Sequence, residues 1–537
     1  MDKEQGKPTF DRRSFIGLGA LAAGAAAASL AGCTPQDTGG NAGTTSGGQT
    51  TATAPVIPAA DETLEFDVVV CGSGMAGMTA ALEAAYQGAN VALIEKMGVL
   101  GGGTNFAEGI FACGSPLQKE RGIKATVKDI LKTEYDFQHF IVDTKLWEVI
   151  AHNSAEDIAW LMDQGVEFID LFNTGGGEYT HHIYMDFRGK TAITAMEAKA
   201  NELGVSIFTN TAAQHLLMEG NAVVGVQADQ DGKIVYLKAK GGVILATGSA
   251  GSNFDLLEKY SIRTPEKTMY NGAPGVEGDG INMAMEIGMG DCFRLMGPWI
   301  GLVVEPLGFN SHLSAAGAME PTNVWVNQNG ERFANEGLVV FYTYPNNCVE
   351  SQVRAYSVLD QAQMDRMVNE GCIMGWAMYI FAGTKLTEAP AEMDRMLAEG
   401  NENCFKAETI EDLAQQMGLP VENLSKTISD YNGYAKAGTD EQYGKDPQFL
   451  APVSTPPYYG FRIKQNCINM YGGIHVNPNN EVIKQDATVI PGLYAAGSEC
   501  GGYQGETYGL ALPGSCQGVS LGTGRVAARN ASARAKG

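Results

Sequence analysis

The sequence predicts an α/β fold built on a Rossmann-like parallel sheet, and three observations lead to this prediction. A β-branched run, Phe66–Cys71, has the composition of a buried parallel strand. The glycine-rich turn Gly72–Gly77 follows at once, and an alanine-rich helical stretch and a second apolar strand, Asn90–Ile94, come after it. Two later apolar segments, 243–248 and 492–497, end in glycine and read as further strands. The order strand, turn, helix, strand is that of a βαβ unit.

The spacing of the glycines in this turn predicts a dinucleotide site. The first glycine of G-x-G-x-x-G makes the tight turn, the second lets backbone N–H groups approach a pyrophosphate, and the third lets helix and strand pack closely. The pyrophosphate then lies at a helix N-terminus, where unpaired N–H groups and the helix dipole favour negative charge. Glu95 ends the second strand and is expected to bind the adenosine ribose hydroxyls.

The next segments favour FAD over NAD. A second glycine-rich loop, Gly101–Asn105, follows Glu95 closely, as it often does in flavoproteins ahead of the isoalloxazine ring. A second complete dinucleotide unit is absent from the sequence, so electrons are expected to come from an external donor. We predict a non-covalently bound FAD. The residues expected to bind it are Gly72, Ser73, Gly74, Met75, Ala76, Gly77, Glu95, Lys96, Gly102, Gly103, Thr104, Ala107, Gly109, Ala213, Ala246, Thr247, Gly248, Asn253, Gly497, Glu499, Gly514, Ser515, Gln517 and Gly518.

Composition and charge narrow the class of protein. A length of 537 residues indicates two or three domains, and 44% apolar with 18% charged residues is typical of a globular chain. The formal charge of -24 argues against a nucleic-acid partner, because binding a phosphate backbone needs clustered Lys and Arg. The ten cysteines are widely spaced, without metal-ligand or haem-attachment spacing, so no metal site is expected.

The N-terminal segment indicates export. Arg12 and Arg13 precede an alanine-rich apolar stretch that is too short for a permanent spanning helix, and Leu30-Ala31-Gly32-Cys33 follows. The paired arginines resemble a twin-arginine signal, and Leu-Ala-Gly-Cys resembles a lipobox whose cysteine is acylated. We expect a protein of the cell envelope, on the outer face of the cytoplasmic membrane or in the periplasm, tethered through acylated Cys33. The Thr-, Gly- and Pro-rich residues up to 61 are expected to form a flexible linker.

Six ordered motifs between residues 64 and 530 resemble the fumarate reductase/succinate dehydrogenase flavoprotein family, which also contains urocanate reductases and 3-ketosteroid dehydrogenases. The motifs are Gly72–Gly77, Ala246–Gly248, Gly278–Gly280 before Met283-Ala284, Gly330–Glu336, Met470–Gly473 and Leu493–Gly497.

The resemblance implies a Rossmann-like FAD-binding domain of the GR2 type, interrupted by an α+β capping domain, with the active site in the cleft between them. Helical stretches expected at 349–371 and 386–434 are compatible with such an insertion. The implied segments are a signal at 1–33, a linker at 34–61, FAD-binding parts at 62–297 and 457–537, and a capping domain at 298–456.

The residues with which fumarate-type members hold a dicarboxylate are missing here. Val304-Glu305-Pro306 stands where the family has a Gln-x-His-Pro stretch, Asn469 replaces a second His, and residues 506–509 lack the family's clamping Arg. The family's proton-delivering Arg falls on Met364, and Arg366 is two places away. Burying two carboxylates without paired cations is costly, so the expected substrate is larger and neutral.

Tyrosines stand near positions that are catalytic in ketosteroid dehydrogenases. Tyr508, shortly before Pro513-Gly514, is similar to the Tyr and Pro-Gly stretch that polarises a carbonyl there, and Tyr342 and Tyr344 follow the Asn-Glu of the capping segment. The resemblance implies hydride transfer from the flavin to a C=C conjugated to a carbonyl, with Tyr508 and the N–H of Gly514 as an oxyanion-hole pair. Tyr342, Tyr344 or Arg366 is expected to supply the proton.

The sequence therefore predicts an FAD-dependent oxidoreductase acting on CH–CH bonds (EC 1.3 type). The favoured activity is reduction of an enone- or acrylate-type C=C in anaerobic respiration, with electrons from a membrane-linked cytochrome or a quinol-derived donor. Two alternatives stay open: a 3-ketosteroid-type FAD dehydrogenase that introduces a C=C, and a non-catalytic flavin electron-transfer lipoprotein. His181 and His182 lack a third ligand at metal spacing, and we interpret them as loop or substrate-entrance residues.

Overall fold

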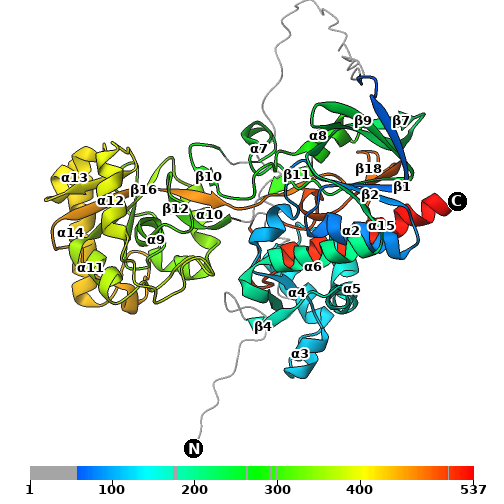
Figure 1. Cartoon of the computed structure of the whole chain (residues 1–537). Coiled ribbons are helices and arrows are strands. Elements are labelled where there is room, and N and C mark those ends of the chain that lie inside the picture. The colour runs from blue at the N-terminus through cyan, green and yellow to red at the C-terminus, as the bar shows by residue number, and fades with distance from the viewer. Residues whose placement is uncertain (1–56, 173–179, 262–263, 291–292, 297–298, 506) are drawn as a thin grey trace, which may run out of the picture. The chain divides into compact units, whose positions relative to one another are not determined.

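The structure is a computed structural model that describes residues 57–172, 180–261, 264–290, 293–296, 299–505 and 507–537 (Figure 1). The paired arginines, the lipobox with Cys33 and most of the predicted linker lie outside these residues, so the export signal stays a prediction. Contacts along the chain group Pro55–Gly537 into one compact unit. Within the described part of the chain, we find no helix with the length and hydropathy of a membrane span.

The larger sheet has eight strands, and most of it is parallel. Strands β19, β9, β1, β2 and β6 pair in parallel, while β18 is added antiparallel to β19, and β8 and β7 continue antiparallel from β9. In sheet order the bounds are β18 (Glu481–Ile483), β19 (Val489–Ala495), β9 (Lys233–Leu245), β1 (Glu62–Cys71), β2 (Val91–Ile94) and β6 (Ser206–Phe208), with β8 (Ala222–Gln230) and β7 (Thr211–Glu219).

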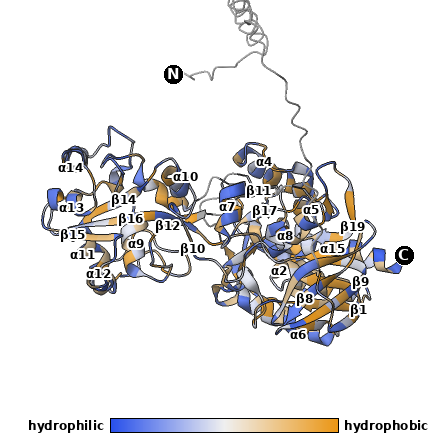
Figure 2. Ribbon diagram, turned by 90° about the horizontal axis from the view of Figure 1, so that it is seen from above, coloured by the Kyte–Doolittle hydropathy of each residue, from blue (hydrophilic) through white to orange (hydrophobic). Residues whose placement is uncertain are grey.

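The β-branched run at the end of β1 explains why this strand lies at the centre. Val68 is opposite Val91 of β2, Val69 is opposite Val243 of β9, and all are buried. Strands covered on both faces are continuously apolar. The last five residues of β9 are all buried in the same way, and Figure 2 shows hydrophobic colour on the ribbon near the β9 and β1 labels. Helices α2 (Met75–Tyr86), α6 (Gly189–Glu202) and α15 (Ser515–Lys536) pack against this sheet or one another. The predicted fold class is confirmed.

A second sheet of six strands is organised around one long strand, β16 (Tyr458–Cys467). It pairs in parallel with β10 and antiparallel with β12, β14 and β15, while β13 pairs with β14. Helices α11 to α14 lie around β16 (Figure 1). The bounds are β10 (Thr268–Tyr270), β12 (Trp299–Val304), β13 (Val324–Asn327), β14 (Ala355–Asp360), β15 (Cys404–Ala407), α9 (His312–Ala318), α10 (Tyr344–Glu350), α11 (Gln361–Asn369), α12 (Ala389–Ala398), α13 (Ile410–Gln416) and α14 (Val421–Ala437).

The expected all-helical stretches at 349–371 and 386–434 are wrong in part, because each contains a strand. All six residues of β14 are buried, so their sequence does not alternate and cannot be told from a buried helix turn by periodicity. The six-stranded sheet also takes β10 and β16 from outside 298–456. The capping-domain boundaries stay predictions.

The remaining strands of the described residues form two smaller sheets, one of β3, β5 and β4 and one of β11 and β17. Their bounds are β3 (Gly109–Phe111), β4 (Phe168–Phe172), β5 (His181–Tyr184), β11 (Phe293–Met296) and β17 (Tyr471–Gly473). The other helices are α3 (Pro116–Glu120), α4 (Val127–Phe137), α5 (Thr144–Asp163), α7 (Phe254–Tyr260) and α8 (Asp279–Glu286), and the 3-10 turns are η1 (Gly102–Phe106), η3 (Met185–Phe187), η4 (Glu336–Phe341), η5 (Pro447–Phe449) and η6 (Gly497–Glu499).

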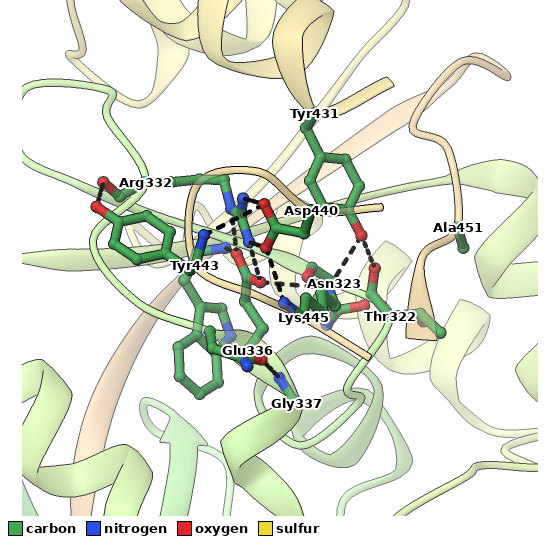
Figure 3. A network of polar contacts seen from close by, with 12 residues as sticks. Thr322, Asn323, Arg332, Glu336, Gly337, Tyr431, Asp440, Tyr443, Lys445 and Ala451 are labelled. Atoms are coloured by element: carbon green, nitrogen blue, oxygen red, sulfur yellow. Dashed lines mark hydrogen bonds and ion pairs between the residues drawn. The ribbon is translucent and has the colours of Figure 1, made fainter. Parts of the chain in front are cut away.

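A buried charged network joins the loop after β13 to the segment after α14 (Figure 3). The guanidinium of Arg332 makes two hydrogen bonds to Glu336, at 2.9 and 2.8 Å, and two to Asp440, both at 3.0 Å. The ammonium of Lys445 lies 3.3 Å from Glu336 and donates to the carbonyl of Asn323 at 2.8 Å. Two cations and two carboxylates therefore balance one another where water is excluded.

Candidate active site

One cavity is lined by most of the predicted cofactor residues. Its lining comes from the turn after β1, η1, the loops after β2 and β9, the start of α15, and the segments around residues 342 and 376–379. Every predicted FAD-binding residue lines it except Gly77, Asn253, Glu499, Ser515 and Gly518. The individual contacts with FAD stay predictions.

Close backbone contacts require glycine at two positions of the turn after β1. Gly72 has φ +101°, and a Cβ there would lie 2.2 Å from the carbonyl oxygen of Ala246. A Cβ at Gly77 would lie 1.8 Å from the carbonyl oxygen of Gly72. Gly77 thus acts from behind the cavity, by letting α2 approach the strand as the motif predicts.

Glu95 lies in the cavity wall and already accepts three hydrogen bonds from the protein. Its Oε2 accepts from the N–H of Ser73 at 3.0 Å and from the Ser73 hydroxyl at 2.6 Å, and Oε1 accepts from the N–H of Met97 at 2.9 Å. The nearby Lys96 pairs with Glu277 at 2.9 Å and with Asp279 at 2.7 Å. Glu95 therefore locks the glycine turn to the end of β2.

Glu499 and Asn253 act outside the cavity wall. The carboxylate of Glu499 accepts from the N–H of Thr247 at 2.6 Å and from its hydroxyl at 2.9 Å. Burial raises the pKa of Glu499 to about 8, against the lowering effect of the Thr247 hydrogen bonds. Asn253 caps α7 by accepting from the N–H of Leu256. Glu499 therefore fixes the loop after β9, and through Thr247 it supports the wall.

The N-terminus of α15 offers polar groups to a bound ring. Gly514 has φ +81°, and a Cβ there would lie 2.6 Å from the backbone of Ile110 and Phe111. The side-chain oxygen of Gln517, in the first turn of this helix of 22 residues, is buried without a hydrogen-bond partner among the described residues. A flavin ring carries both an N–H donor and carbonyl acceptors. The unpaired oxygen and the positive helix end therefore fit a flavin here.

Aromatic side chains line the opposite part of the cavity. Phe309 stacks on Tyr379 with ring centroids 4.9 Å apart and meets Trp376 edge-on at 5.1 Å. The phenol oxygen of Tyr342 accepts from the N–H of Ala377, and burial raises the pKa of Tyr342 despite this hydrogen bond. These rings form an apolar wall with two hydroxyl groups.

Of the predicted catalytic residues, Tyr508, Gly514 and Tyr342 line the cavity. The Tyr508 hydroxyl accepts from the N–H of Cys516 at 3.5 Å, which places it at the start of α15 near Gly514, and burial raises the pKa of Tyr508. The structure brings these three residues to one cavity; their roles stay predictions.

The structure does not bring Tyr344 or Arg366 to the cavity. Tyr344 stacks on Phe137 and packs against Phe341. The guanidinium of Arg366 is held by Glu320 at 2.7 Å and by the carbonyl of Gly371 at 3.1 Å. Because neither side chain lines the cavity, the structure gives no support to Tyr344 or Arg366 as the proton donor.

Two cavity residues were missed or misplaced by sequence reasoning. His181 and His182 were interpreted as loop or substrate-entrance residues. The loop is wrong, because both belong to the buried strand β5, whereas His181 does line the cavity. Burial lowers the pKa of His181 to about 3, so it is neutral. Glu108 also lines the cavity. Its position between Ala107 and Gly109, both predicted to bind FAD, was the available signal.

Residues 67–510 match the family described as FAD binding domain. The chain belongs to this family. A vinyl phenol reductase of Lactiplantibacillus plantarum is 36% identical over 87% of this chain and 96% of that protein. A urocanate reductase of Eggerthella lenta is 30% identical over 89% of this chain and 77% of that protein. The open conformation of a flavocytochrome c3 fumarate reductase is 26% identical with a TM-score of 0.66, covering 89% of this chain and 79% of that one.

These similarities confirm the predicted family and the class of enzyme. The protein is an FAD-dependent oxidoreductase that acts on CH–CH bonds, and its predicted likeness to fumarate reductases and 3-ketosteroid dehydrogenases is confirmed. FAD as the cofactor is confirmed as well.

Proposed function

We propose that this protein reduces the C=C bond of a neutral substrate in which the double bond is conjugated to an oxygen-bearing ring, as in a vinyl phenol or a cyclic enone. FAD is held without a covalent bond and supplies hydride transfer to one carbon of the double bond. The similarity to a vinyl phenol reductase, which covers 96% of that protein, supports a phenolic substrate within this class.

The observation that carries the proposal is the composition of the cavity wall. Its cap-side rings, Phe309, Tyr342, Trp376 and Tyr379, are uncharged. Among the described residues that line the cavity, Lys96 is the one Lys or Arg, and it is paired with two carboxylates. A dicarboxylate would remain without partners in this wall, which is strongly unfavourable, whereas a flat neutral ring is complementary to it.

Tyr508 and Gly514 are suited to binding the oxygen of the substrate. Because burial raises the pKa of Tyr508, its hydroxyl stays protonated and can donate a hydrogen bond. The N–H of Gly514 lies at the positive end of α15, where developing negative charge is stabilised. Together they hold the ring and withdraw charge from the conjugated double bond.

The electron donor and the location belong to the proposal. Arg12-Arg13 and Leu30–Cys33 support twin-arginine export and an acylated Cys33 in the cell envelope. A donor outside the cytoplasm is then a membrane-linked cytochrome or a quinol-derived carrier. The formal charge of -24 would attract a basic donor surface.

The test is anaerobic reoxidation of the reduced, FAD-loaded protein by a panel of vinyl phenols, cyclic enones, acrylates and fumarate. We expect fast reoxidation by at least one neutral conjugated alkene, with the saturated product formed in equal amount, and little by fumarate. If fumarate alone reoxidises the protein, the proposal is wrong. Reduction of oxidised protein by saturated 3-ketosteroids, without alkene reduction, would instead support the dehydrogenase alternative.

A further inference from the structure

We propose that Glu108 is the catalytic acid of this site and gives its proton to the alkene carbon that does not receive the hydride. This assignment rests on the proposed function. It differs from the expected donors Tyr342, Tyr344 and Arg366, of which only Tyr342 lines the cavity.

The backbone around Glu108 is fixed between the cofactor loop and a paired strand. Its carbonyl accepts from the N–H of Tyr184 at 3.1 Å, and the carbonyl of Ala107 accepts from Gly189 at 2.8 Å. The next residue, Gly109, begins β3 and is in register with Ile183 of β5. Glu108 therefore lines the cavity from a held position, directly between two residues expected to contact FAD.

Of the carboxyl groups that line the cavity, Glu108 is the one that fits the role of proton donor. The lining carboxyl groups are Glu95, Glu108 and Asp279. Glu95 accepts three hydrogen bonds from Ser73 and Met97, and Asp279 pairs with Lys96. Within the described part of the chain, by contrast, the Glu108 side chain accepts no hydrogen bond and makes no ion pair closer than 4 Å, so its proton is not committed to a protein group.

The charged and titratable groups around Glu108 suit a carboxyl that gains and loses a proton. Arg188 interacts with it from the start of α6, and Tyr342 and Tyr379 interact with it from the segments after η4 and after Trp376. Burial raises the pKa of Glu108, while Arg188 opposes the rise. The Arg188 guanidinium lies 4.7 Å from the ring centre of Tyr379. This cation stabilises the carboxylate that remains after proton transfer.

Other groups of the cavity are weaker acids at neutral pH. Burial raises the pKa of Tyr342 and of Tyr379 above that of an ordinary phenol. His181 is neutral, because burial lowers its pKa to about 3, and a neutral imidazole is a very weak acid. A catalytic acid works best when its pKa lies near the working pH. The pKa of an ordinary carboxyl is lower than this, and burial raises it toward the working pH. The two tyrosines then position the substrate ring.

The step balances in atoms and electrons. The C=C π bond breaks, and one carbon forms a C–H bond with the hydride, which brings both electrons. The other carbon takes the proton of the Glu108 carboxyl, which becomes a carboxylate. Water then returns a proton to Glu108, and the product is the saturated compound.

The direct test compares Glu108→Gln with the wild type in anaerobic reoxidation by the best alkene of the panel. We expect the rate to fall about a hundredfold or more, since general acid catalysis contributes roughly 10² to 10⁴, with FAD content unchanged. Glu108→Asp should recover part of the rate. The exposed Glu167→Gln, just before β4, is the matched control and should react as the wild type does.

A second measurement is independent of turnover. Binding of a saturated phenol such as 4-ethylphenol to the oxidised protein removes water from Glu108, and we expect proton uptake, measured by calorimetry in two buffers of different ionisation enthalpy. Glu108→Gln should bind the phenol without that uptake. If this variant takes up the same number of protons, or reduces the alkene as fast as an active wild type does, the acid role of Glu108 is wrong and the proposed function is unaffected. A wild type that no alkene reoxidises rejects the proposed function, and the acid role with it.

Discussion

At the scale of single residues, the contacts of Gly77 decide whether the nucleotide turn can form. A side chain there would meet the carbonyl of Gly72 at 1.8 Å, and neither backbone can give way without opening the turn. We expect Gly77→Val to abolish FAD binding in a protein that otherwise folds, measured as the FAD-to-protein ratio. Gly433→Ala in α14, where a Cβ meets nothing within 4 Å, is the control and should keep full FAD. A yellow, fully loaded Gly77→Val protein would contradict this account.

The Tyr508 hydroxyl is the second residue-scale test. A donor aimed at developing charge is worth about 2.7–4 kcal/mol, so Tyr508→Phe should lower the rate of alkene reduction roughly a hundredfold or more while FAD stays bound. Tyr344→Phe removes the same atom outside the cavity wall and should keep the wild-type rate. Single-turnover kinetics of both variants measures the difference. Equal rates for both would remove Tyr508 from the mechanism.

Sequence reasoning named most of the residues that line the cavity, but it also named Tyr344 and Arg366, which do not line it, and this has a physical reason. The turn Gly72–Gly77 and the Ser73–Glu95 contact depend on local chain geometry, which motif spacing encodes. Whether Arg366 or Glu108 faces the cavity depends on partners far away in the chain, such as Glu320 and Arg188. Such pairings have no local pattern.

At the scale of elements, the network around Arg332 fastens η4 to the segment after α14. Removing one member of a buried ion pair leaves an uncompensated charge and costs about 3–5 kcal/mol. We therefore expect Asp440→Asn to lower the melting temperature clearly. Asp430→Asn removes one partner of the exposed Lys426–Asp430 pair, which is worth about 1 kcal/mol or less, and should change little. Similar melting temperatures for the two variants would show that the network adds no stability.

The same network predicts that the stability of the protein depends on pH in the acid range. Burial would raise the pKa of Asp440, but the hydrogen bond and charge of Arg332 lower it to about 2, below the ordinary 3.8. Its contribution to stability is thus complete above about pH 5 and is lost as the pH falls through 3.8 toward 2. The difference in melting temperature between wild type and Asp440→Asn should shrink from pH 5 to pH 3. A difference that stays constant over this range would refute the linkage.

Elements were predicted best where a glycine motif accompanies them. β1, α2, β2 and β19 were all expected, although β1 begins four residues and β19 three residues before the predicted start. β14 and β15 were not expected, because their short sequences carry no turn motif. Pairing with distant strands makes them part of a sheet, β14 with β13 and β16, and β15 with β16.

At the scale of the whole molecule, the formal charge of -24 should influence how fast electron carriers arrive. Opposite charge raises association rates, and salt screens the effect over roughly 8–10 Å at 0.1–0.15 M ionic strength. We expect reduction of the bound FAD by a cationic viologen dye to slow as ionic strength rises, while reduction by a neutral dye stays constant. Stopped-flow rates at several salt concentrations test this. Equal salt dependence for both dyes would rule out electrostatic attraction.

The place of β16 late in the sequence has a consequence for biosynthesis. This strand holds the six-stranded sheet together, and β19 and α15, which follow it, complete the larger sheet and the cofactor wall. In a nascent polypeptide the six-stranded sheet is therefore incomplete until β16 leaves the ribosome, and the larger sheet with its cofactor wall is incomplete until β19 and α15 follow. Flavin loading must therefore wait for α15, and a chain that ends before β16 would offer cellular proteases two incomplete cores.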